Sequence, residues 1–355
     1  MSKVDILDDE TAIKKIDRSG MLSVVGQMPE MLLQAAGFAA GVPPPSLKKI
    51  SQVLVLGMGG SAIAGDIAAD LFARKSQVPI LTHRNYGLPE FVGPETLVFA
   101  LSYSGDTEEV LSAVKEAERR GLPPVCITSG GKLRELAENK KYPLCLIPSG
   151  YQPRAALPYL LIPLINILEK AKIVPASAEE IKEAAALLQK LREEYDPAKP
   201  LRSNAVKQLA KKLTGKIPFI LGSTGTTAAA ALRLKNQFSE NGKVTAALNL
   251  FPELDHNEIV NLGSLKRADH SFSLIILRDE EDNERVKRRI EITKSLISRQ
   301  IGGASEIISQ GKSFFARLLS LIFFGDLLSV YLAVLQGIDP TPVEVIARLK
   351  KELTR

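Results

Sequence analysis

A chain of 355 residues with 45% apolar and 24% charged residues has the composition of a soluble globular protein and is long enough for two domains. Its net charge of +6 arises from lysines and arginines dispersed among acidic residues, which argues against a nucleic-acid-binding surface. The acidic N-terminus lacks an apolar export signal, and the two cysteines lie in apolar runs, so we expect a cytoplasmic protein with reduced thiols.

In the first half of the chain, apolar strand-like runs alternate with helical runs. Alternation of this kind predicts a parallel sheet covered by helices on both faces. The cysteines, Cys126 and Cys145, fall in two of these strands, where we expect them to pack as small hydrophobic residues. The predicted strands are 51–60, 77–83, 95–105, 123–131 and 142–150, and the predicted helices are 61–75, 106–121 and 132–140.

The second half of the chain begins the same pattern again. Residues 215–238 repeat the order of apolar strand, glycine-rich corner and alanine-rich helix, and they align Gly57 with Gly222 and Gly60 with Gly225. Such repetition predicts two copies of one α/β unit, and ligands favour the clefts that such halves form. Further strands are predicted at 270–279 and 305–311, and further helices at 176–196, 283–298, 314–337 and 341–353.

We therefore predict an α/β protein with two tandem doubly wound parallel-sheet domains and helices on both faces. The N-terminal domain is expected at 1–150, a helical connector at 151–200, and the C-terminal domain with its final helices at 201–355. The most apolar run, 314–337, contains Arg317 and Asp326, so we expect a buried helix rather than a membrane span.

Two nucleotide-binding patterns are only partly met. The corner VLGMGGSA (55–62) fits G-x-G-x-x-G/A, but no acidic ribose-binding residue follows at 82–85, which read Thr-His-Arg-Asn. The stretch 306–313 has the Gly-Lys-Ser of a P-loop, but Glu306 stands where its first glycine should be. We therefore disfavour both a nicotinamide dinucleotide site and a P-loop.

The stretch LSYSGDTEEV offers three hydroxyls at the start of a predicted helix, those of Ser102, Ser104 and Thr107. Hydroxyls, strand-ending glycines and the positive end of a helix dipole suit a phosphate group without the need for a metal ion. The alternative is that Ser104 or Asp106 merely caps the helix. The phosphate interpretation is favoured because the corner GGSA also lies at the carboxyl end of a strand, where α/β sheets bind ligands.

The motif pair GMGGSA and SYSGDTEE resembles the sugar isomerase (SIS) domain family. Two tandem copies, with GYQPRAALPY between them and FPELDHNEI in the second, resemble the bifunctional phosphoglucose/phosphomannose isomerases over essentially the whole chain. The resemblance implies two SIS-type domains in a homodimer that acts on a sugar phosphate. The implied reaction interconverts glucose 6-phosphate and mannose 6-phosphate with fructose 6-phosphate, by base-mediated proton transfer through a cis-enediol and without a cofactor.

The resemblance places the phosphate of the sugar at two loops. The first contains Gly60 and Ser61, and the second contains the three hydroxyls of SYSGDT. The family usually has Asn where this chain has Asp106. An anion beside a phosphate would repel it, so we expect Asp106 to face away or to cap the helix.

Isomerisation needs a base, a stabiliser for the developing oxyanion and a group that opens the sugar ring. The resemblance implies Glu240 in SENGK as the base, Arg154 in QPRAALPY as the stabiliser, and His256 in PELDHNE as the ring-opening group, contributed across a dimer interface. From the residues alone, Glu240 can equally be a solvent-facing side chain before a turn, and His256 a surface histidine. No acidic residue lies within 148–158 to pair with Arg154, and the resemblance to the family's PRA motif favours its functional role.

The family also uses a lysine near its C-terminus, for which Lys350 and Lys351 are candidates. We choose Lys350 because it flanks an apolar stripe that we expect to face inward, formed by Val343, Ile346, Leu349 and Leu353. Thr341 is expected near the C2–C4 hydroxyls of the sugar, where a small side chain leaves room for both C2 epimers. It can also be a simple N-cap.

Three alternatives compete with the isomerase. A non-catalytic SIS sensor of sugar phosphates needs no base, so the joint presence of Glu240, His256 and Arg154 argues against it. An amino-sugar isomerase such as the SIS half of a glucosamine-6-phosphate synthase carries an N-terminal glutaminase domain with a leading cysteine, and we find neither in this sequence. A nicotinamide dehydrogenase would need the ribose-binding acid. The H-x-E spacing at His256 is poor for zinc, so we expect catalysis without a metal ion.

Overall fold

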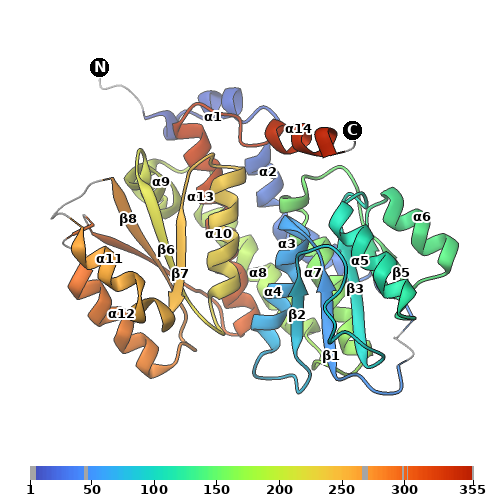
Figure 1. Ribbon diagram of the computed structural model, residues 1–355. Helices are drawn as coiled ribbons and strands as arrows, with labels where there is room; N and C mark the ends of the chain where they lie inside the picture. The colour runs from blue at the N-terminus through green and yellow to red at the C-terminus, as the bar shows by residue number, and fades with distance from the viewer. Residues whose placement is uncertain (1–4, 44–46, 266–270, 298–299, 302, 354–355) are drawn as a thin grey trace. The chain divides into compact units, whose positions relative to one another are not determined.

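The computed structural model describes residues 5–43, 47–265, 271–297, 300–301 and 303–353. In this part of the chain, contacts divide the protein into two compact units (Figure 1). The first-sheet unit comprises Gln27–Leu187 with Gly311–Ala316, and the second-sheet unit comprises 5–26, Leu188–Gln310 and 317–353. The units interleave along the chain, whereas the predicted domains follow one another with a connector at 151–200.

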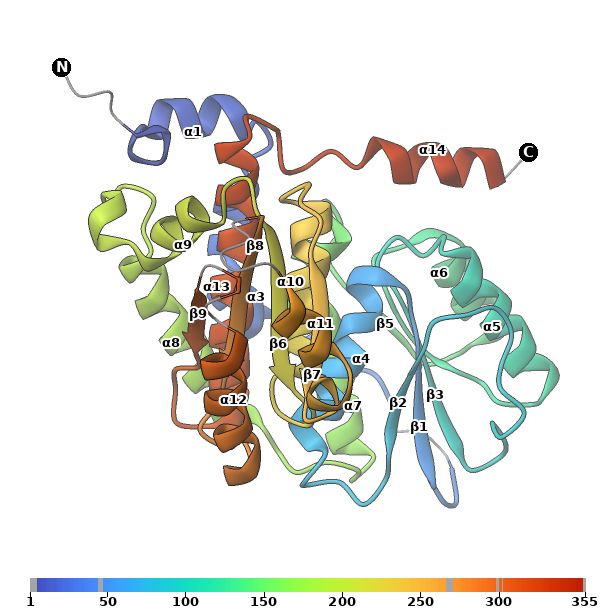
Figure 2. The same cartoon turned by 60° about the vertical axis from the view of Figure 1, so that its left-hand side comes forward.

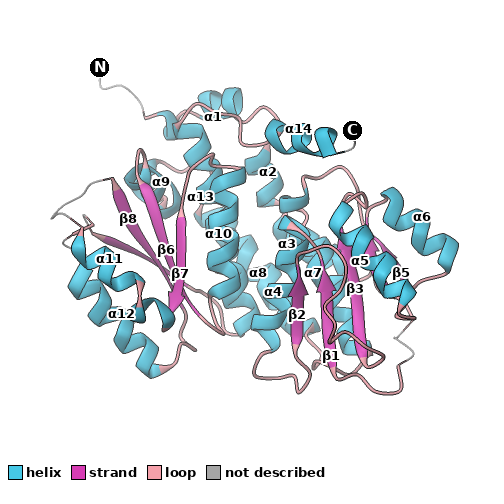
Figure 3. Cartoon of the chain, viewed as in Figure 1, coloured by secondary structure: helices cyan, strands magenta, loops and turns pink. Residues whose placement is uncertain are grey.

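The first-sheet unit contains five parallel strands in the order β2-β1-β3-β4-β5 (Figure 3). The strands are β1 (Gln52–Leu56), β2 (Ile80–His83), β3 (Thr96–Ser102), β4 (Val125–Thr128) and β5 (Leu144–Leu146). Every residue of the central strand β3 is buried, because helices cover both faces of the sheet. Since β1 and β3 are parallel neighbours, their carboxyl ends lie side by side.

Five helices form the outer layers of this unit. Helices α4 (Gly59–Phe72) and α7 (Leu157–Lys170) cover one face of the sheet, with α3 (Met28–Ala35) packed against α7, and α5 (Glu108–Arg119) and α6 (Gly131–Lys140) cover the other (Figure 2). The helical spacing of Val110, Ala113 and Ala117 places these residues on the buried face of α5, against strand residues such as Leu54 and Val98. The packing therefore directs the start of α4 and of α5 to the same edge of the sheet.

The second-sheet unit contains four parallel strands in the order β7-β6-β8-β9. The strands are β6 (Ile217–Ser223), β7 (Ala247–Phe251), β8 (Phe272–Arg278) and β9 (Ala304–Ile308). Helices α11 (Glu258–Ser264) and α12 (Glu284–Ile297) cover one face, and α10 (Ala228–Glu240) and α13 (Phe314–Leu335) lie on the other (Figure 2). The neighbours of β6 correspond to those of β1, which confirms the predicted α/β fold class with two parallel sheets.

The structure also contains elements that the sequence pattern does not predict. Strand β7 reads ALNLF, which is too short and too mixed to show the apolar run of its neighbours. The predicted strand at 270–279 starts outside the described residues, and β8 begins at Phe272. The sequence pattern also does not predict the helices α1 (Glu10–Ile16), α2 (Met21–Gly26), α3, α9 (Ala205–Leu213) and α11.

Helix α13 is buried within the protein, as we predicted from the two charged residues that disfavour a membrane span. The helix is long and apolar enough to cross a membrane, but 94% of its most apolar window is buried within the structure. The Asp326 carboxylate accepts hydrogen bonds from Arg233 Nε at 3.0 Å and Nη2 at 2.6 Å, and from Gln237 Nε2 at 2.9 Å. This buried bidentate ion pair joins α13 to α10. Removal of either charge would leave the other buried without a partner of opposite charge, which destabilises the fold.

Loss of one partner of this pair should destabilise the second-sheet unit. The Arg233 side chain is 3% exposed, so Asp326→Ala should lower the free energy of unfolding by about 3–5 kcal/mol. Chemical denaturation measures this change. The control is Lys287→Ala, which removes an exposed pair with Glu284 on α12 and should cost below about 1 kcal/mol. Equal losses in the two variants would contradict the effect assigned to burial.

Candidate active site

The predicted site residues are divided between the two units. The first-sheet unit contains Gly60, Ser61, Ser102, Ser104, Thr107 and Arg154. The second-sheet unit contains Glu240, His256, Thr341 and Lys350. The former set gathers at the carboxyl ends of β1 and β3, whereas the latter set is spread over the end of α10, the turn after β7 and the C-terminal segment.

The first corner joins β1 to α4. Its N-cap residue is Met58, whose side chain does not cap the helix, so the start of α4 retains N–H donors that suit an anion. A Cβ at Gly60 would meet the backbone of Pro153 and Arg154 at 2.9 Å. The lack of a side chain at Gly60 therefore allows the Arg154 segment to lie against this corner. Arg154 itself is buried in a short 3-10 helix, Pro153–Ala155.

The second corner joins β3 to α5 and contains the three predicted hydroxyls. The Ser102 Oγ lies 2.8 Å from Thr107 Oγ1 and accepts the Gly105 N–H at 3.1 Å, so the buried Ser102 shapes the loop from within. Ser104 is exposed and accepts the Asp106 N–H at 3.3 Å. Thr107 is the N-cap residue of α5, yet its side chain makes no capping bond to that helix. The exposed Ser104 hydroxyl and the N–H groups at the start of α5 thus remain the natural phosphate donors.

Ser61 brings the two corners together. Its Oγ accepts the backbone N–H of Tyr103 at 3.1 Å, which joins the start of α4 to the loop after β3. Tyr103 was not singled out from the sequence, although its place between two serines of SYSGDT was a usable signal. Burial raises the pKa of Tyr103, and its hydroxyl donates to the Pro148 carbonyl at 2.9 Å while accepting the Tyr151 N–H at 2.9 Å. Tyr103 thereby links the hydroxyl loop to the segment that leads to Arg154.

Asp106 caps a different helix from the one expected. Its Oδ1 accepts the Lys132 N–H at 3.1 Å, so it satisfies a donor at the start of α6 rather than α5. The Leu133 N–H donates to the Gly105 carbonyl at 2.9 Å, which holds the same two loops together. The approach is so close that a Cβ at Gly105, where φ is +74°, would lie 1.8 Å from the Gly130 oxygen. The Asp106 carboxylate, which replaces the family's Asn, therefore bonds to the start of α6 and not to the exposed hydroxyl of Ser104.

In the second-sheet unit, Glu240 and Thr341 lie on two segments that one lysine connects. Glu240 is the last residue of α10, and the Lys243 ammonium donates to its backbone carbonyl. The same ammonium donates to the carbonyls of Pro340 at 3.2 Å and Pro342 at 2.8 Å, on either side of Thr341. Helix α14 (Glu344–Leu353) begins three residues beyond Thr341, so the interpretation of Thr341 as its N-cap is wrong.

His256 ends a 3-10 turn, Glu253–His256, that follows β7 directly. The turn is anchored through Asp255, whose carboxylate accepts from Thr293 Oγ1 at 2.8 Å and from Arg289 Nη1 at 3.0 Å. The His256 side chain is exposed. Within the described ranges, no group of three or more His, Cys, Asp or Glu side chains is arranged to hold a metal ion.

Lys350 lies on α14, and the structure contradicts the reason for choosing it. The helix has no buried residue, and Ile346, Leu349 and Leu353 are 43%, 59% and 60% exposed. The apolar stripe therefore does not face inward in the single chain. An amphipathic pattern indicates that one face of a helix suits burial, but it does not say that the same chain supplies the covering surface. Both Lys350 and Lys351 remain candidates.

The corresponding corner of the second-sheet unit is unsuited to phosphate. The loop after β8 carries Asp279, Glu280, Glu281 and Asp282 where the first sheet has its hydroxyl loop. Arg317 pairs with the first three of these at 3.0, 2.7 and 2.6 Å. Thr226, the counterpart of Ser61 in the sequence repeat, donates to the Asp282 carboxylate. Four carboxylates would repel an anion, so only the first-sheet corner has the character of a phosphate site.

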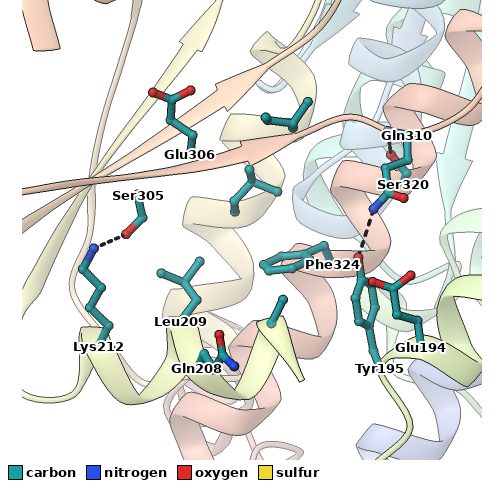
Figure 4. Close-up of a pocket in the computed structure, with 13 residues that line it drawn as sticks. Glu194, Tyr195, Gln208, Leu209, Lys212, Ser305, Glu306, Gln310, Ser320 and Phe324 are labelled. Atoms are coloured by element: carbon teal, nitrogen blue, oxygen red, sulfur yellow. Dashed lines mark hydrogen bonds between the residues drawn. The ribbon is translucent and has the colours of Figure 1, made fainter. Parts of the chain in front are cut away.

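A cavity of about 510 Å³ in the second-sheet unit lies away from these residues (Figure 4). It is lined by residues of α9, β9 and α13, and none of the predicted site residues contributes to it. Two pairs of its polar side chains bond to each other, with Gln310 donating to the Tyr195 hydroxyl at 3.1 Å and Lys212 to Ser305 at 2.9 Å. Volume alone therefore does not identify the active site of this protein.

Models of known domain families match segments in both units of the chain. The model of the SIS domain matches residues 46–151, and the model described as bacterial phospho-glucose isomerase C-terminal SIS domain matches residues 202–353. A bifunctional phosphoglucose/phosphomannose isomerase of Caldicellulosiruptor bescii is 42% identical, over 94% of this chain and 98% of its own. Another of the same name, from Aquifex aeolicus, is 36% identical over 85% of this chain and 90% of its own.

Solved structures support the same fold. The crystal structure of a hypothetical protein from Thermus thermophilus superposes with a TM-score of 0.72 at 18% identity, covering 98% of this chain and 93% of the other. At that identity the similarity concerns the fold alone. The sequence relatives, by contrast, match at 36–42% identity over nearly their whole length. This chain, with its two SIS domains, belongs to the family of bifunctional phosphoglucose/phosphomannose isomerases.

Proposed function

We propose that the protein is an aldose–ketose isomerase that interconverts fructose 6-phosphate with glucose 6-phosphate and mannose 6-phosphate. The observation that carries the proposal is the joined corner of the first-sheet unit, where the start of α4, the hydroxyl loop and the buried Arg154 meet. A purely regulatory sugar-phosphate sensor is not favoured, because the relatives at 36–42% identity are named as enzymes.

The phosphate of the sugar is proposed to bind at this corner. The N–H groups at the starts of α4 and α5 would supply donors and partial positive charge, and the exposed Ser104 would add a hydroxyl. Ser61, Ser102 and Thr107 would act mainly by holding the loop in shape. Phosphate binding then fixes one end of the substrate and leaves C1 and C2 for the chemistry.

The proposed reaction moves one proton between two carbons of the sugar. Glu240 takes the proton from C2 of the open-chain aldose and returns it to C1, while a second proton passes from the C2 hydroxyl to the C1 oxygen. The aldehyde thereby becomes an alcohol and the C2 alcohol becomes a ketone. The intermediate is a cis-enediol(ate), whose developing negative charge Arg154 would stabilise. Because the proton returns to the same sugar, the step consumes no oxidant, reductant or cofactor.

The remaining assignments are part of the same proposal. The His256 imidazole opens the ring by passing a proton to O5, and the active form is a homodimer in which His256 of the partner subunit does this. The exposed His256 side chain and the exposed apolar face of α14 support that arrangement. Lys350 or Lys351 and Thr341 would contact the sugar hydroxyls.

A cytoplasmic location, with a role in glycolysis and gluconeogenesis, is also proposed. Both cysteines are free, and burial raises the pKa of the Cys126 thiol to about 12 and of the Cys145 thiol to about 11. Both thiols therefore stay protonated near neutral pH, which suits a reducing compartment.

A direct assay tests the reaction. Purified protein incubated with fructose 6-phosphate and EDTA should form both glucose 6-phosphate and mannose 6-phosphate, each detected by a coupled dehydrogenase. The EDTA tests whether turnover survives metal removal, as expected for proton transfer by a carboxylate. Binding of fructose 6-phosphate without formation of either aldose would refute the proposed activity.

Glu240→Gln should separate binding from turnover. The amide keeps the size of the side chain but cannot accept the C2 proton, so we expect kcat to fall by roughly 10²–10⁴-fold with little change in affinity for fructose 6-phosphate. Steady-state kinetics and isothermal calorimetry measure the two quantities. The control is Glu193→Gln on the exposed face of α8 (Ala178–Glu194), which should keep wild-type turnover. Wild-type kcat in Glu240→Gln would remove this residue from the base role.

Gly105→Ala should weaken phosphate binding. The new Cβ would clash with the Gly130 carbonyl oxygen at 1.8 Å, and φ of +74° is strained for alanine, so the hydroxyl loop must move. We expect KM for fructose 6-phosphate to rise by about tenfold or more, because the strain of one such residue is roughly 1–3 kcal/mol. The control is Gly93→Ala, where a Cβ has no neighbour within 4 Å. An unchanged KM in folded Gly105→Ala would argue that phosphate binds elsewhere.

A further inference from the structure

The turn at the end of α10, residues 239–243, contains a lysine in an unusual backbone conformation. Lys243 has a φ of +52°, in the left-handed region, although Gly242 precedes it directly. For a residue with a side chain this conformation costs on the order of 1–2 kcal/mol. A strained residue persists when its side chain or backbone is needed, so the contacts of Lys243 indicate its role.

The Lys243 ammonium donates to three backbone carbonyls. Glu240 offers one of the carbonyls at the end of α10 that have no partner within the helix, where a positive charge is favourable. Pro340 and Pro342 offer the other two, at 3.2 and 2.8 Å. An ammonium has three N–H donors, and these three carbonyls can use all of them. Lys243 therefore joins the helix end that carries Glu240 to the segment that carries Thr341.

Two further bonds hold the same turn rigidly against α13. The buried Asn241 donates from Nδ2 to Ser329 Oγ at 3.0 Å, and Gln336 Nε2 donates to the Gly242 carbonyl. These bonds fix the turn to the helix, and the Lys243 bonds extend the anchorage beyond the end of α13 to the prolines around Thr341. One ammonium group thus contributes directly to the position of Thr341 relative to Glu240.

We propose that Lys243 is a positioning residue that sets Thr341 against the base Glu240 and thereby controls which C2 epimer forms. The inference rests on the proposed function. Protonation of the enediol at opposite faces of C2 gives glucose 6-phosphate or mannose 6-phosphate, so the ratio of the two products reports how the sugar carbons lie against the base. Loss of the Lys243 bonds releases the Thr341 segment and changes the surface that the C2–C4 hydroxyls contact. This change alters the ratio of the two products as well as the rate of the reaction.

The test is Lys243→Met, which keeps the length of the side chain and removes all three donors. We expect kcat with fructose 6-phosphate to fall by roughly tenfold to a hundredfold, because small misplacement of reacting groups has effects of that size. The KM should stay within about threefold, since the phosphate corner is unchanged, and the ratio of glucose to mannose product should shift. Lys243→Arg, which retains a cation with several donors, should recover part of the wild-type kcat and part of the wild-type product ratio. The control is Lys216→Met, just before β6 at the amino end of the sheet, which should match the wild type.

Each outcome decides the inference. Wild-type kcat and product ratio in folded Lys243→Met overturn it, as does a lower melting temperature with unchanged kinetics below that temperature. If Lys243→Met does not fold, Lys243→Gln is measured in the same way. Failure of that variant to fold assigns the lysine to stability and also overturns the inference. A wild-type protein without isomerase activity removes the proposed function itself, whereas an active wild type with unchanged variants removes only the role of Lys243.

Discussion

The hydrogen bond between the Tyr103 backbone N–H and the Ser61 hydroxyl joins the corner after β1 to the corner after β3. Parallel pairing brings these strand ends side by side, and the bond then ties the starts of α4 and α5 to each other. Each helix start carries N–H donors and partial positive charge, so the two joined helix starts suit an anion such as the proposed phosphate. The backbone of the Arg154 segment lies against this corner because Gly60 has no side chain to keep it away. A change that separates the corners therefore weakens the whole site.

The corresponding corners of the two α/β units differ in charge. In the first-sheet unit the loops are short of carboxylates and rich in N–H and hydroxyl groups, and the one carboxylate, Asp106, is occupied by the start of α6. In the second-sheet unit the equivalent loop is acidic, and Arg317 neutralises part of its charge. The repeat therefore supplies a common scaffold, while the charge of a few loop residues favours the first-sheet corner for the proposed phosphate site.

The proposed catalytic groups of the second-sheet unit lie where helices and strands end, and hydrogen bonds fix those ends. Glu240 lies at the negative end of the α10 dipole, and the Lys243 ammonium in the same turn offsets that unfavourable position. The His256 turn is anchored to α12 through Asp255. Such anchorage would limit the freedom that the proposed base and ring-opening group lose on binding substrate, which would favour proton transfer at a defined atom.

The amino-acid sequence by itself determined the alternation of strands and helices, the repeat of the α/β unit, the glycine corners and the motifs of the family, because each of these is a local pattern. Only the tertiary structure decided which distant groups meet. Strand β7 forms because β6 offers an edge to pair with, Asp106 caps α6 because two loops approach closely, and α14 stays exposed because its own chain supplies no cover. Residues 5–26 belong with the second sheet for the same reason, since contacts between segments far apart in the chain leave no trace in local periodicity.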